Sequence, residues 1–415
     1  MKVLILGLNY APERVGIAVY TAGMAEILTE RGHQVEVVAG QPYYPEWRVR
    51  PGYSRFWYSA TVENGVRITR CPHYVPSRPG AARRILHYLS FALTSLFPTL
   101  WAALTRRPDI VVAVAPALAA APVARIAARL CGAKAWLHIQ DFEIDAAIGT
   151  GLVSGSGSLV RLARAVERGI LGSFDTVSTI SPQMCRKLHH KGVAADRIFE
   201  FRNWADLGNI APLRRPSAFR QRWGITTPYV ALYSGNIANK QGLEIIVQAA
   251  RRLAHRTDLT FVICGDGTSR ANLETQAAGL TNLQFHGLEP HSELNELLAL
   301  ATVHLLPQLA GAAGAVLPSK LTNMLASGRP VIATAAPGSD LAIEIDGCGI
   351  ATPPQDAEQF AAAIEQLLND ADLRHEFSQA AYARALERWS PASIFANFDR
   401  ALHALTGLAT EFRSA

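Results

Sequence analysis

Short apolar runs alternate with amphipathic segments along the first half of the chain. The run at 2–8 is followed by a segment at 16–32 whose apolar residues recur at helical spacing, and then by an apolar run at 33–40. The same alternation returns in the segments 109–116, 121–132, 133–140 and 175–181. Strands that alternate with helices are typical of a parallel α/β sheet that carries helices on both faces.

The alternation breaks once and then starts again. Residues 207–228 are polar, contain prolines and hold no strand-like run. From residue 229 onward strand-like runs again alternate with helical segments, and the chain ends in long helical stretches at 356–388 and 391–406. We therefore predict a second doubly wound sheet after the break.

Length and pattern together predict two domains, because 415 residues are too many for one ordinary core. We place one Rossmann-like domain at 1–206 and a second at 207–390, with 391–415 packing back on the first. Two such domains are expected to face each other across a cleft. Ligands of open α/β sheets bind outside the carboxyl ends of the strands, so the candidate functional residues are those that directly follow a predicted strand.

Glycines and a lysine follow two predicted strands of the second domain. Gly265 and Gly267 form a Gly-x-Gly turn before a helix, where glycines let the backbone approach a ligand and helix-start amides favour an anion. Asn236 and Lys240 follow the strand at 229–234, and a lysine near a helix start is disfavoured by the helix dipole unless an anion balances it. A tight turn and a solvated lysine are the alternatives. The turn is not a full Gly-x-Gly-x-x-Gly, which argues against a dinucleotide-dependent dehydrogenase.

A second lysine stands at the start of another predicted helix. Lys320 is one of only six lysines in the chain and follows Ser319 in the turn AVLPSK. A lysine and a hydroxyl at a helix start predict a place that holds a phosphate group.

A histidine and a run of acids follow a strand of the first domain. His138 precedes Asp141, Glu143 and Asp145. A histidine at the mouth of a cleft can hydrogen-bond a sugar hydroxyl or a developing charge; the alternative is a structural histidine tied to a neighbouring carboxylate. One acidic stretch is weak evidence for a metal site, and we expect none. The five cysteines are scattered and form no CxxC pair, which fits a reducing cytoplasm.

Positive charge gathers in the first domain around an uncharged segment. Residues 48–107 hold ten arginines and one acid, Glu63, but no aromatic–basic interleaving, so we expect no nucleic-acid partner. The uncharged segment 85–104 lies between two pairs of arginines. It could span a bilayer, form a buried helix or lie in the membrane interface. Strand-like segments on both sides disfavour spanning, and we expect peripheral membrane contact through 83–107.

Several stretches spread over nearly the whole chain resemble one enzyme family. They are LGLNYAPERVGIAVYTAGMAEILTERGHQVEVVAGQPYYPEW, RCPHYVPSRP, LHIQDFEIDA, VSTISPQM, FRNWAD, YSGNIANKQGLE and AVLPSKLTNMLASGRPVIAT. In their order and spacing the chain resembles the retaining glycosyltransferases of family 4, and within them the bacterial exopolysaccharide transferases of the colanic-acid type. This resemblance implies the GT-B fold, in which two Rossmann-like α/β domains face each other across a cleft.

The resemblance also implies roles for particular residues. His138, or else Asp141, would correspond to the active-site histidine region, and Lys240 and Lys320 would contact the diphosphate of the donor. The donor-binding residues would be Gly16, Gly235, Asn236, Gly265, Gly267, Gly287, Leu288, Leu317, Ser319 and Asn323. The sequence departs from the family at two points, because Asn236 stands where an arginine is usual, and Ala315 and Asn323 stand where two glutamates are usual. Lys320 would compensate for the missing arginine.

The implied reaction is the transfer of a sugar, with retention of configuration and without a metal, from a nucleotide diphosphate sugar to a polyprenyl-diphosphate-linked oligosaccharide in exopolysaccharide biosynthesis. The colanic-acid likeness favours GDP-fucose as donor, and no cofactor is expected beyond this substrate. The enzyme would act in the cytoplasm, peripherally on the inner face of the cytoplasmic membrane. Two alternatives remain: a nucleotide-sugar epimerase on the same fold, which would leave the segment 85–104 unexplained, and a scaffold that binds nucleotide or membrane without catalysis. The sequence does not determine the oligomeric state.

Overall fold

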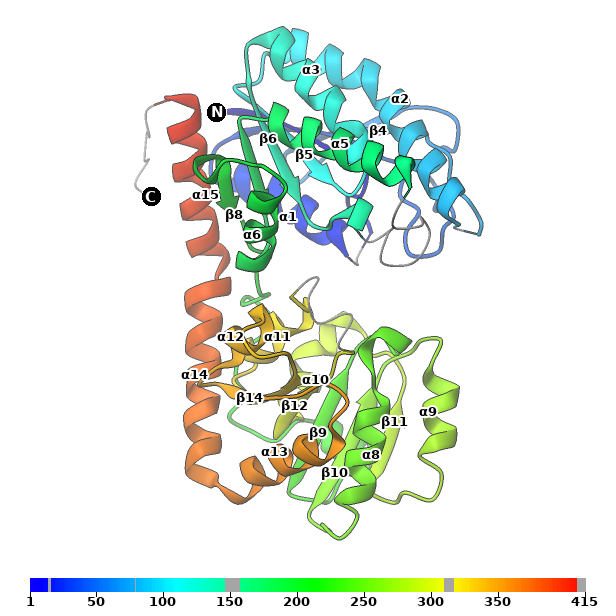
Figure 1. Ribbon diagram of the computed structural model, residues 1–415, viewed down its shortest axis with the longest axis vertical. Coiled ribbons are helices and arrows are strands. Elements are labelled where there is room, and N and C mark those ends of the chain that lie inside the picture. The colour runs from blue at the N-terminus through cyan, green and yellow to red at the C-terminus, as the bar shows by residue number, and fades with distance from the viewer. Residues whose placement is uncertain (14–15, 79, 146–156, 310–316, 409–415) are drawn as a thin grey trace. The chain divides into compact units, whose positions relative to one another are not determined.

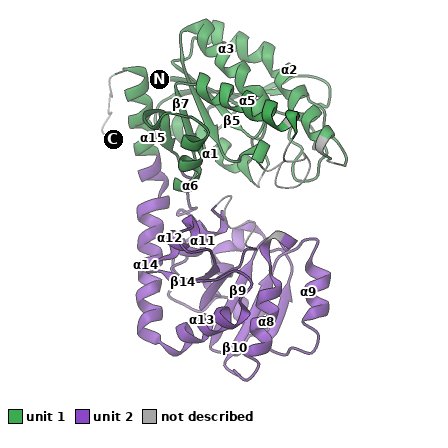
Figure 2. Cartoon of the chain, viewed as in Figure 1, with its two compact units in different colours: residues 1–201, 395–415 green, residues 202–394 purple. Residues whose placement is uncertain are grey.

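Two compact units make up the molecule (Figure 2). The computed structural model describes residues 1–13, 16–78, 80–145, 157–309 and 317–408. Unit 1 comprises Met1–Phe201 together with Phe395–Ala415, and unit 2 comprises Arg202–Ile394. The boundary predicted after residue 206 lies after Phe201 in the structure, and the chain rejoins unit 1 at Phe395, within the predicted segment 391–415.

Unit 1 is built on one sheet with the strand order β3-β4-β2-β1-β5-β6-β7-β8. Every neighbouring pair is parallel except β3 and β4, which form a hairpin through Asn64 and Gly65, both at positive φ. Two positive-φ residues are what a two-residue hairpin turn requires. The strands are β1 (Lys2–Gly7), β2 (Gln34–Gly40), β3 (Ser59–Glu63), β4 (Val66–Cys71), β5 (Ile110–Ala115), β6 (Lys134–Ile139), β7 (Thr176–Thr179) and β8 (Ile198–Glu200).

Helices connect the parallel strands of unit 1 (Figure 1). The α-helices are α1 (Ile17–Glu30), α2 (Ala81–Arg106), α3 (Ala121–Cys131), α5 (Ser158–Ser173) and α6 (Pro182–His190), with single 3₁₀ turns η1 (Leu118–Ala120) and η2 (Ala195–Arg197). The last helix, α15 (Pro391–Thr406), lies beside β8, where Phe398 stacks on Phe201 with ring centroids 4.3 Å apart and meets Trp136 edge-on at 5.1 Å.

Helix α2 contains the apolar segment 85–104. Within the described part of the chain, Ala82–Arg106 is the one helix long and apolar enough to cross a membrane. However, α2 packs along α3, η1 and strands β1, β2 and β4, and the strands before and after it, β4 and β5, belong to the same sheet. A spanning helix would separate those two strands across the bilayer. The structure therefore favours a helix that lies on the surface of unit 1.

Unit 2 has a second sheet, parallel throughout, with the strand order β11-β10-β9-β12-β13-β14. The strands are β9 (Tyr229–Ser234), β10 (Leu259–Cys264), β11 (Leu283–His286), β12 (Val303–Leu306), β13 (Val331–Thr334) and β14 (Gly349–Thr352). The helices are α7 (Phe219–Arg222), α8 (Glu244–Arg252), α9 (Arg270–Gln276), α10 (Leu294–Ala299), α11 (Lys320–Ala326), α12 (Asp340–Ile345), α13 (Ala357–Asn369) and α14 (Ala371–Trp389), with 3₁₀ turns η3 (Asn239–Gln241) and η4 (His291–Glu293). Two doubly wound sheets, one parallel throughout and one parallel apart from its β3–β4 hairpin, confirm the predicted α/β fold class.

Both faces of the second sheet are buried, as a parallel sheet requires. Along β9, Ala231 and Tyr233 point into a core shared with α8 and α13, whereas Val230 and Leu232 point into a core shared with α7 and α10. This alternation places Tyr233, the last buried residue of the strand, on the α8 face. The ring there supports the loop that follows β9.

The predicted helical stretch 356–388 is two helices. Asp370 ends α13 and also starts α14, where its side chain accepts a hydrogen bond from Leu373 N at 2.9 Å. A carboxylate that caps a new helix start competes with a continuous helix at that point. Helical periodicity continues on both sides of Asp370, which is why the pattern alone did not separate the two helices.

Candidate functional site

Two loops meet at the carboxyl edge of the second sheet. The loop after β9 is bonded to the loop after β10, because Gly235 N donates to Cys264 O and Ile237 N donates to Asp266 O, each at 2.8 Å. Gly265 and Gly267 have φ near +150°. A Cβ atom on Gly265 would strike Gly235 O, and one on Gly267 would strike Ile237 O. Glycine is therefore required at both positions, and the loops present backbone rather than side chains at this edge.

Lys320 reaches this edge from α11. Its Nζ donates to Tyr233 Oη at 2.5 Å and lies 4.3 Å from the centroid of the Tyr233 ring. The Tyr233 hydroxyl in turn donates to Asn236 O at 2.6 Å, and burial raises its pKa, so the partner of the ammonium is a neutral phenol. A Cβ atom on Gly235 would overlap the end of the Lys320 side chain. The fold thus brings together Lys320, Gly235 and Asn236, which are far apart in the sequence.

The predicted donor-binding residues around Lys320 differ in exposure and in hydrogen bonding. Ser319 precedes α11 and is exposed, with no hydrogen bond to cap the helix. Leu317 is half-buried beneath the helix start. The side chain of Asn323 is engaged elsewhere, since its Oδ1 accepts from Asp206 N at 3.3 Å. This bond holds the chain where it enters unit 2, and the contact of Asn323 with the donor stays a prediction. Ala315 lies outside the described residues.

The loop after β11 lies next to the same edge. Leu288 is 77% exposed, and Gly287 O accepts from Cys264 Sγ at 3.1 Å, so the loop is anchored while the leucine faces outward. Arg270, which the sequence interpretation missed, ties the two loops together, because its NH1 donates to Gly265 O at 2.6 Å and to His286 O at 2.8 Å. An arginine one turn after a Gly-x-Gly motif was the available signal.

Two predicted residues precede helices near their sheets' carboxyl edges. Lys240 belongs to η3, directly after the β9 loop, and its side chain lies outside the described part of the structure. Gly16, in unit 1, stands at the start of α1 with φ 63° and with open space where a Cβ would be. Among the residues that the structure describes, none lies within 4 Å of that Cβ position.

His138 lies inside unit 1 rather than at its surface. Only 2% of the residue is exposed; Nδ1 pairs with Ser178 Oγ at 2.9 Å and Nε2 with Gln140 Nε2 at 3.0 Å. Burial lowers the pKa of His138 to about 3, so the imidazole is neutral. Direct contact with a substrate, as predicted, does not fit this burial. The ring instead orients Gln140.

The acids after β6 have separate partners. Asp141 is exposed, whereas Glu143 accepts from the backbone of Ala117 and Leu118, and burial raises the pKa of Glu143 to about 7. Asp145 pairs with Lys187 at 2.8 Å, and its lysine partners lower its pKa against the opposing effect of burial. Within the described residues, no group of three or more metal-ligand side chains gathers.

A further buried carboxylate was missed from the sequence. Glu13 is 3% exposed and accepts from Tyr43 N and Tyr44 N, both at 2.8 Å, and from Asn9 Nδ2 at 3.0 Å. It joins the loops that follow β1 and β2. The expectation that ligands bind after the strands pointed to these loops. The sequence pattern alone did not distinguish a buried glutamate from an exposed one.

Comparison with known families and proteins identifies this architecture. Residues 15–204 match the model of the glycosyl transferase 4-like domain, and residues 217–384 match the model of the glycosyl transferases group 1. The proposed colanic acid biosynthesis glycosyl transferase WcaI of Escherichia coli (strain K12) is 41% identical over 378 residues, which cover 89% of this chain and 92% of WcaI. The chain is a group 1 glycosyltransferase. The family predicted from the sequence is thereby confirmed.

Other relatives share smaller parts of this glycosyltransferase. The alpha-D-kanosaminyltransferase of Streptomyces kanamyceticus is 32% identical over 171 residues, which cover 40% of this chain and 43% of that enzyme. The match is consistent with family membership and does not extend to a common substrate.

Solved structures confirm the GT-B fold of the glycosyltransferase. Sucrose-phosphate synthase from Thermosynechococcus elongatus superimposes with a TM-score of 0.75 at 16% identity, covering 98% of this chain and 100% of that one. Anabaena Alr3699/HepE, solved in complex with UDP-glucose, superimposes with a TM-score of 0.68 at 15% identity, covering 97% of this chain and 100% of that one. At these identities the likeness concerns the fold alone.

Proposed function

We propose that this glycosyltransferase transfers a sugar, with retention and without a metal, from a nucleotide diphosphate sugar to a polyprenyl-diphosphate-linked oligosaccharide of an exopolysaccharide pathway. The observation that carries the proposal is the position of Lys320 Nζ beside the Gly235 backbone, at the edge where sheets of this class bind ligands. The name of WcaI supports the pathway, and the UDP-glucose complex of HepE supports the donor class.

The proposed chemistry uses the charge of the leaving group. As the bond between the sugar C1 and the diphosphate breaks, negative charge develops on the phosphate oxygens. Lys320, with Lys240, would stabilise that charge in place of a metal. The acceptor hydroxyl would attack from the face that the diphosphate leaves, and its proton would pass to an oxygen of the departing diphosphate. The glycine loops at 265 and 267 would allow the nucleotide to approach the backbone. We propose GDP-fucose as the donor, as the colanic-acid likeness implies.

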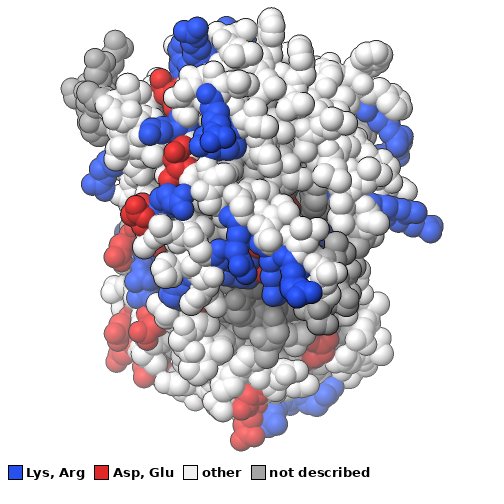
Figure 3. All heavy atoms as spheres, turned by 45° about the horizontal axis from the view of Figure 1, so that its top comes forward, with Lys and Arg blue, Asp and Glu red and all other residues white. Residues whose placement is uncertain are grey.

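The proposed acceptor is a lipid, and one face of unit 1 supports this. Side chains of α2 leave a broad apolar strip exposed, with Leu93, Phe97 and Trp101 between 61% and 73% exposed. The same helix also exposes Ile85, Leu86, Leu89, Leu96 and Leu104. Figure 3 shows few charged side chains over α2 and α3, and lysines or arginines at the border of this area. An amphipathic face bordered by cations suits the interface of an anionic membrane, so we place the enzyme peripherally on the cytoplasmic face.

The donor site is tested by binding. Thermal shifts with GDP, UDP, GDP-fucose and UDP-glucose are measured without added metal on the wild type, on Lys320→Ala and on the control Lys134→Ala, an exposed lysine at the start of β6. Loss of the Lys320 ammonium, a charged hydrogen-bond donor, should weaken diphosphate binding about tenfold or more. Lys134→Ala should bind like the wild type. Equal shifts in all three proteins would exclude this site. A preference for UDP ligands would keep the mechanism and reject GDP-fucose.

The membrane contact is tested with vesicles. Sedimentation with anionic vesicles should recover the wild type, whereas the double variant Phe97→Gln/Trp101→Gln should stay in solution. Ile343→Gln, which changes an apolar residue 49% exposed on α12 of unit 2, is the matched control. If the α2 variant sediments like the wild type, membrane docking through this face is wrong.

A further inference from the structure

A pocket of unit 2 lies at the edge of the sheet opposite the glycine loops and Lys320. Its volume is about 500 Å³, which is within the usual range for a small-molecule site. Pro228, Thr302 and Arg329 line it and precede β9, β12 and β13, so the pocket is at the amino ends of these strands. The glycine loops and Lys320 lie at the carboxyl ends. The two sites therefore do not overlap.

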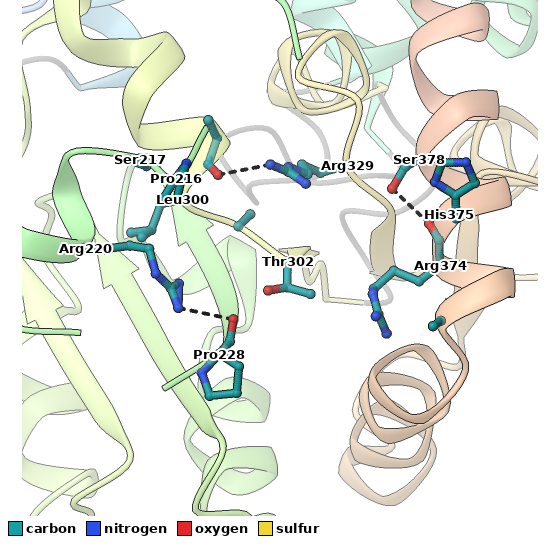
Figure 4. A pocket seen from close by; sticks show the side chains of 13 residues that line it. Pro216, Ser217, Arg220, Pro228, Leu300, Thr302, Arg329, Arg374, His375 and Ser378 are labelled. Atoms are coloured by element: carbon teal, nitrogen blue, oxygen red, sulfur yellow. Dashed lines mark hydrogen bonds between the residues drawn. The ribbon is translucent and has the colours of Figure 1, made fainter. Parts of the chain in front are cut away.

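Three arginines surround this pocket. Arg220 comes from α7, Arg329 from the turn before β13 and Arg374 from α14, and Figure 4 shows them around Thr302 from three sides. His375 also lines the pocket, and no aspartate or glutamate is among the described residues that do. Three like charges in a concave surface create a strong positive potential that favours an anion.

The arginines bond to backbone oxygens rather than to carboxylates. Arg220 NH2 donates to Pro228 O at 3.2 Å, and Arg374 NH1 donates to Leu367 O at 2.7 Å. These bonds orient the guanidinium groups without neutralising them, since a carbonyl carries no formal charge.

Arg329 has weaker hydrogen bonds than Arg220 and Arg374. Its NH2 donates to Ala299 O at the long distance of 3.5 Å, its Nε is buried without a hydrogen-bond partner, and burial lowers its pKa. A buried donor without a partner costs free energy that an anionic ligand would recover. Thr302 Oγ1 accepts from Val230 N at 3.0 Å, which leaves the hydroxyl proton available to an acceptor in the pocket.

We propose that this pocket binds the phosphate group of a small metabolite, at a site separate from the donor site. Guanidinium groups bind phosphate oxygens by paired, charge-assisted hydrogen bonds, and three of them match a group that carries more than one negative charge. A pocket of this volume holds a phosphate together with the sugar or nucleoside attached to it.

The experiment measures pyrophosphate binding by calorimetry on the full chain, in a Lys320→Ala background in which the proposed donor site is weakened. Binding should persist in that background and fall about tenfold or more when Arg329→Gln is added. The control is Arg252→Gln, which changes an exposed arginine of α8 whose carboxylate partner, Glu358, is 4.0 Å away. Control and parent should bind alike.

A second variant guards against loss of folding. His375→Glu changes an exposed side chain and adds negative charge to the pocket, so it should weaken binding while leaving the melting curve unchanged. Inorganic phosphate and GDP serve as further probes. Tighter binding of GDP assigns the pocket to a nucleotide, and equal binding of all three assigns it to the phosphate group alone. The proposal is overturned if pyrophosphate does not bind in the Lys320→Ala background. It is also overturned if adding Arg329→Gln and adding His375→Glu both leave the affinity of that parent unchanged.

Discussion

The carboxyl edges of the two sheets are built from different material. In unit 2 the edge consists of glycine backbone, with Gly265 and Gly267 packed against the neighbouring loop and one lysine above them. In unit 1 the loops are held by the buried side chains of Glu13 and His138 and by the half-buried Glu143. Bare backbone lets a charged ligand approach closely, whereas buried ionisable groups shape loops through hydrogen bonds. Substitutions at this edge should therefore act through steric clashes in unit 2. In unit 1, substitutions of the titratable side chains should change how stability depends on pH.

The largest effect should come from filling the glycine contact of unit 2. Gly267→Ala would place a methyl group against Ile237 O and within 2.6 Å of Asn236 Oδ1, at a backbone φ of 153°. We expect a loss of about 3 kcal/mol in the free energy of unfolding of unit 2, measured by urea denaturation. Gly279→Ala has a positive φ but open space, so it should cost about 1 kcal/mol. Equal losses would show that backbone strain, not contact, sets the requirement.

The buried histidine should matter for stability rather than for a proton transfer. His138→Gln breaks the bonds to Ser178 and Gln140 and should cost about 2 kcal/mol at pH 7. The control His189→Gln changes an exposed residue of α6 and should cost almost nothing. An unchanged stability in His138→Gln would remove the structural role assigned to the ring.

The same variant has a pH signature. The folded pKa of His138, about 3, lies below the ordinary value of 6.5, so between these pH values the unfolded chain binds the proton more readily. The wild type therefore loses stability as the pH falls through this window, by up to about 1.4 kcal/mol per pH unit. Because Gln does not titrate, the stability difference between wild type and His138→Gln should shrink below pH 6.5 and close or reverse by pH 4 in chemical denaturation.

Glu143 should show the opposite slope. Its folded pKa of about 7 lies above the ordinary 4.5, so the folded state binds the proton more readily, and the wild type loses stability as the pH rises from 4.5 to 7. Glu143→Gln stays neutral and keeps an acceptor for Ala117 N and Leu118 N. The difference in the free energy of unfolding between Glu143→Gln and the wild type should therefore shift in favour of the variant by about 1 kcal/mol or more from pH 5 to pH 8. A constant difference across this range would contradict the buried, protonated carboxyl.

The smallest effect should come from the open glycine of unit 1. Gly16→Ala should cost about 1 kcal/mol through its positive φ alone, because no atom of the described part of the chain lies within 4 Å of the added methyl group. Gly80→Ala, at negative φ with equally open space, is the control and should be neutral. A loss as large as that of Gly267→Ala would contradict the open space at the Cβ position of Gly16.

Local sequence patterns were enough to predict the two doubly wound sheets, the approximate unit boundary and the family. These depend on local signals: periodicity identifies strands and helices, and glycine is needed wherever a loop must take a positive φ. Lys320 was found by its position at a helix start. Three contacts could be seen only in the folded chain: Lys320 meets Tyr233 and Gly235, Asn323 accepts from Asp206 N, and His138 is buried. Those outcomes depend on how layers stack over long sequence separations, which a local pattern does not encode. The arginine pocket is of the same kind, since its three guanidinium groups come from three separate elements.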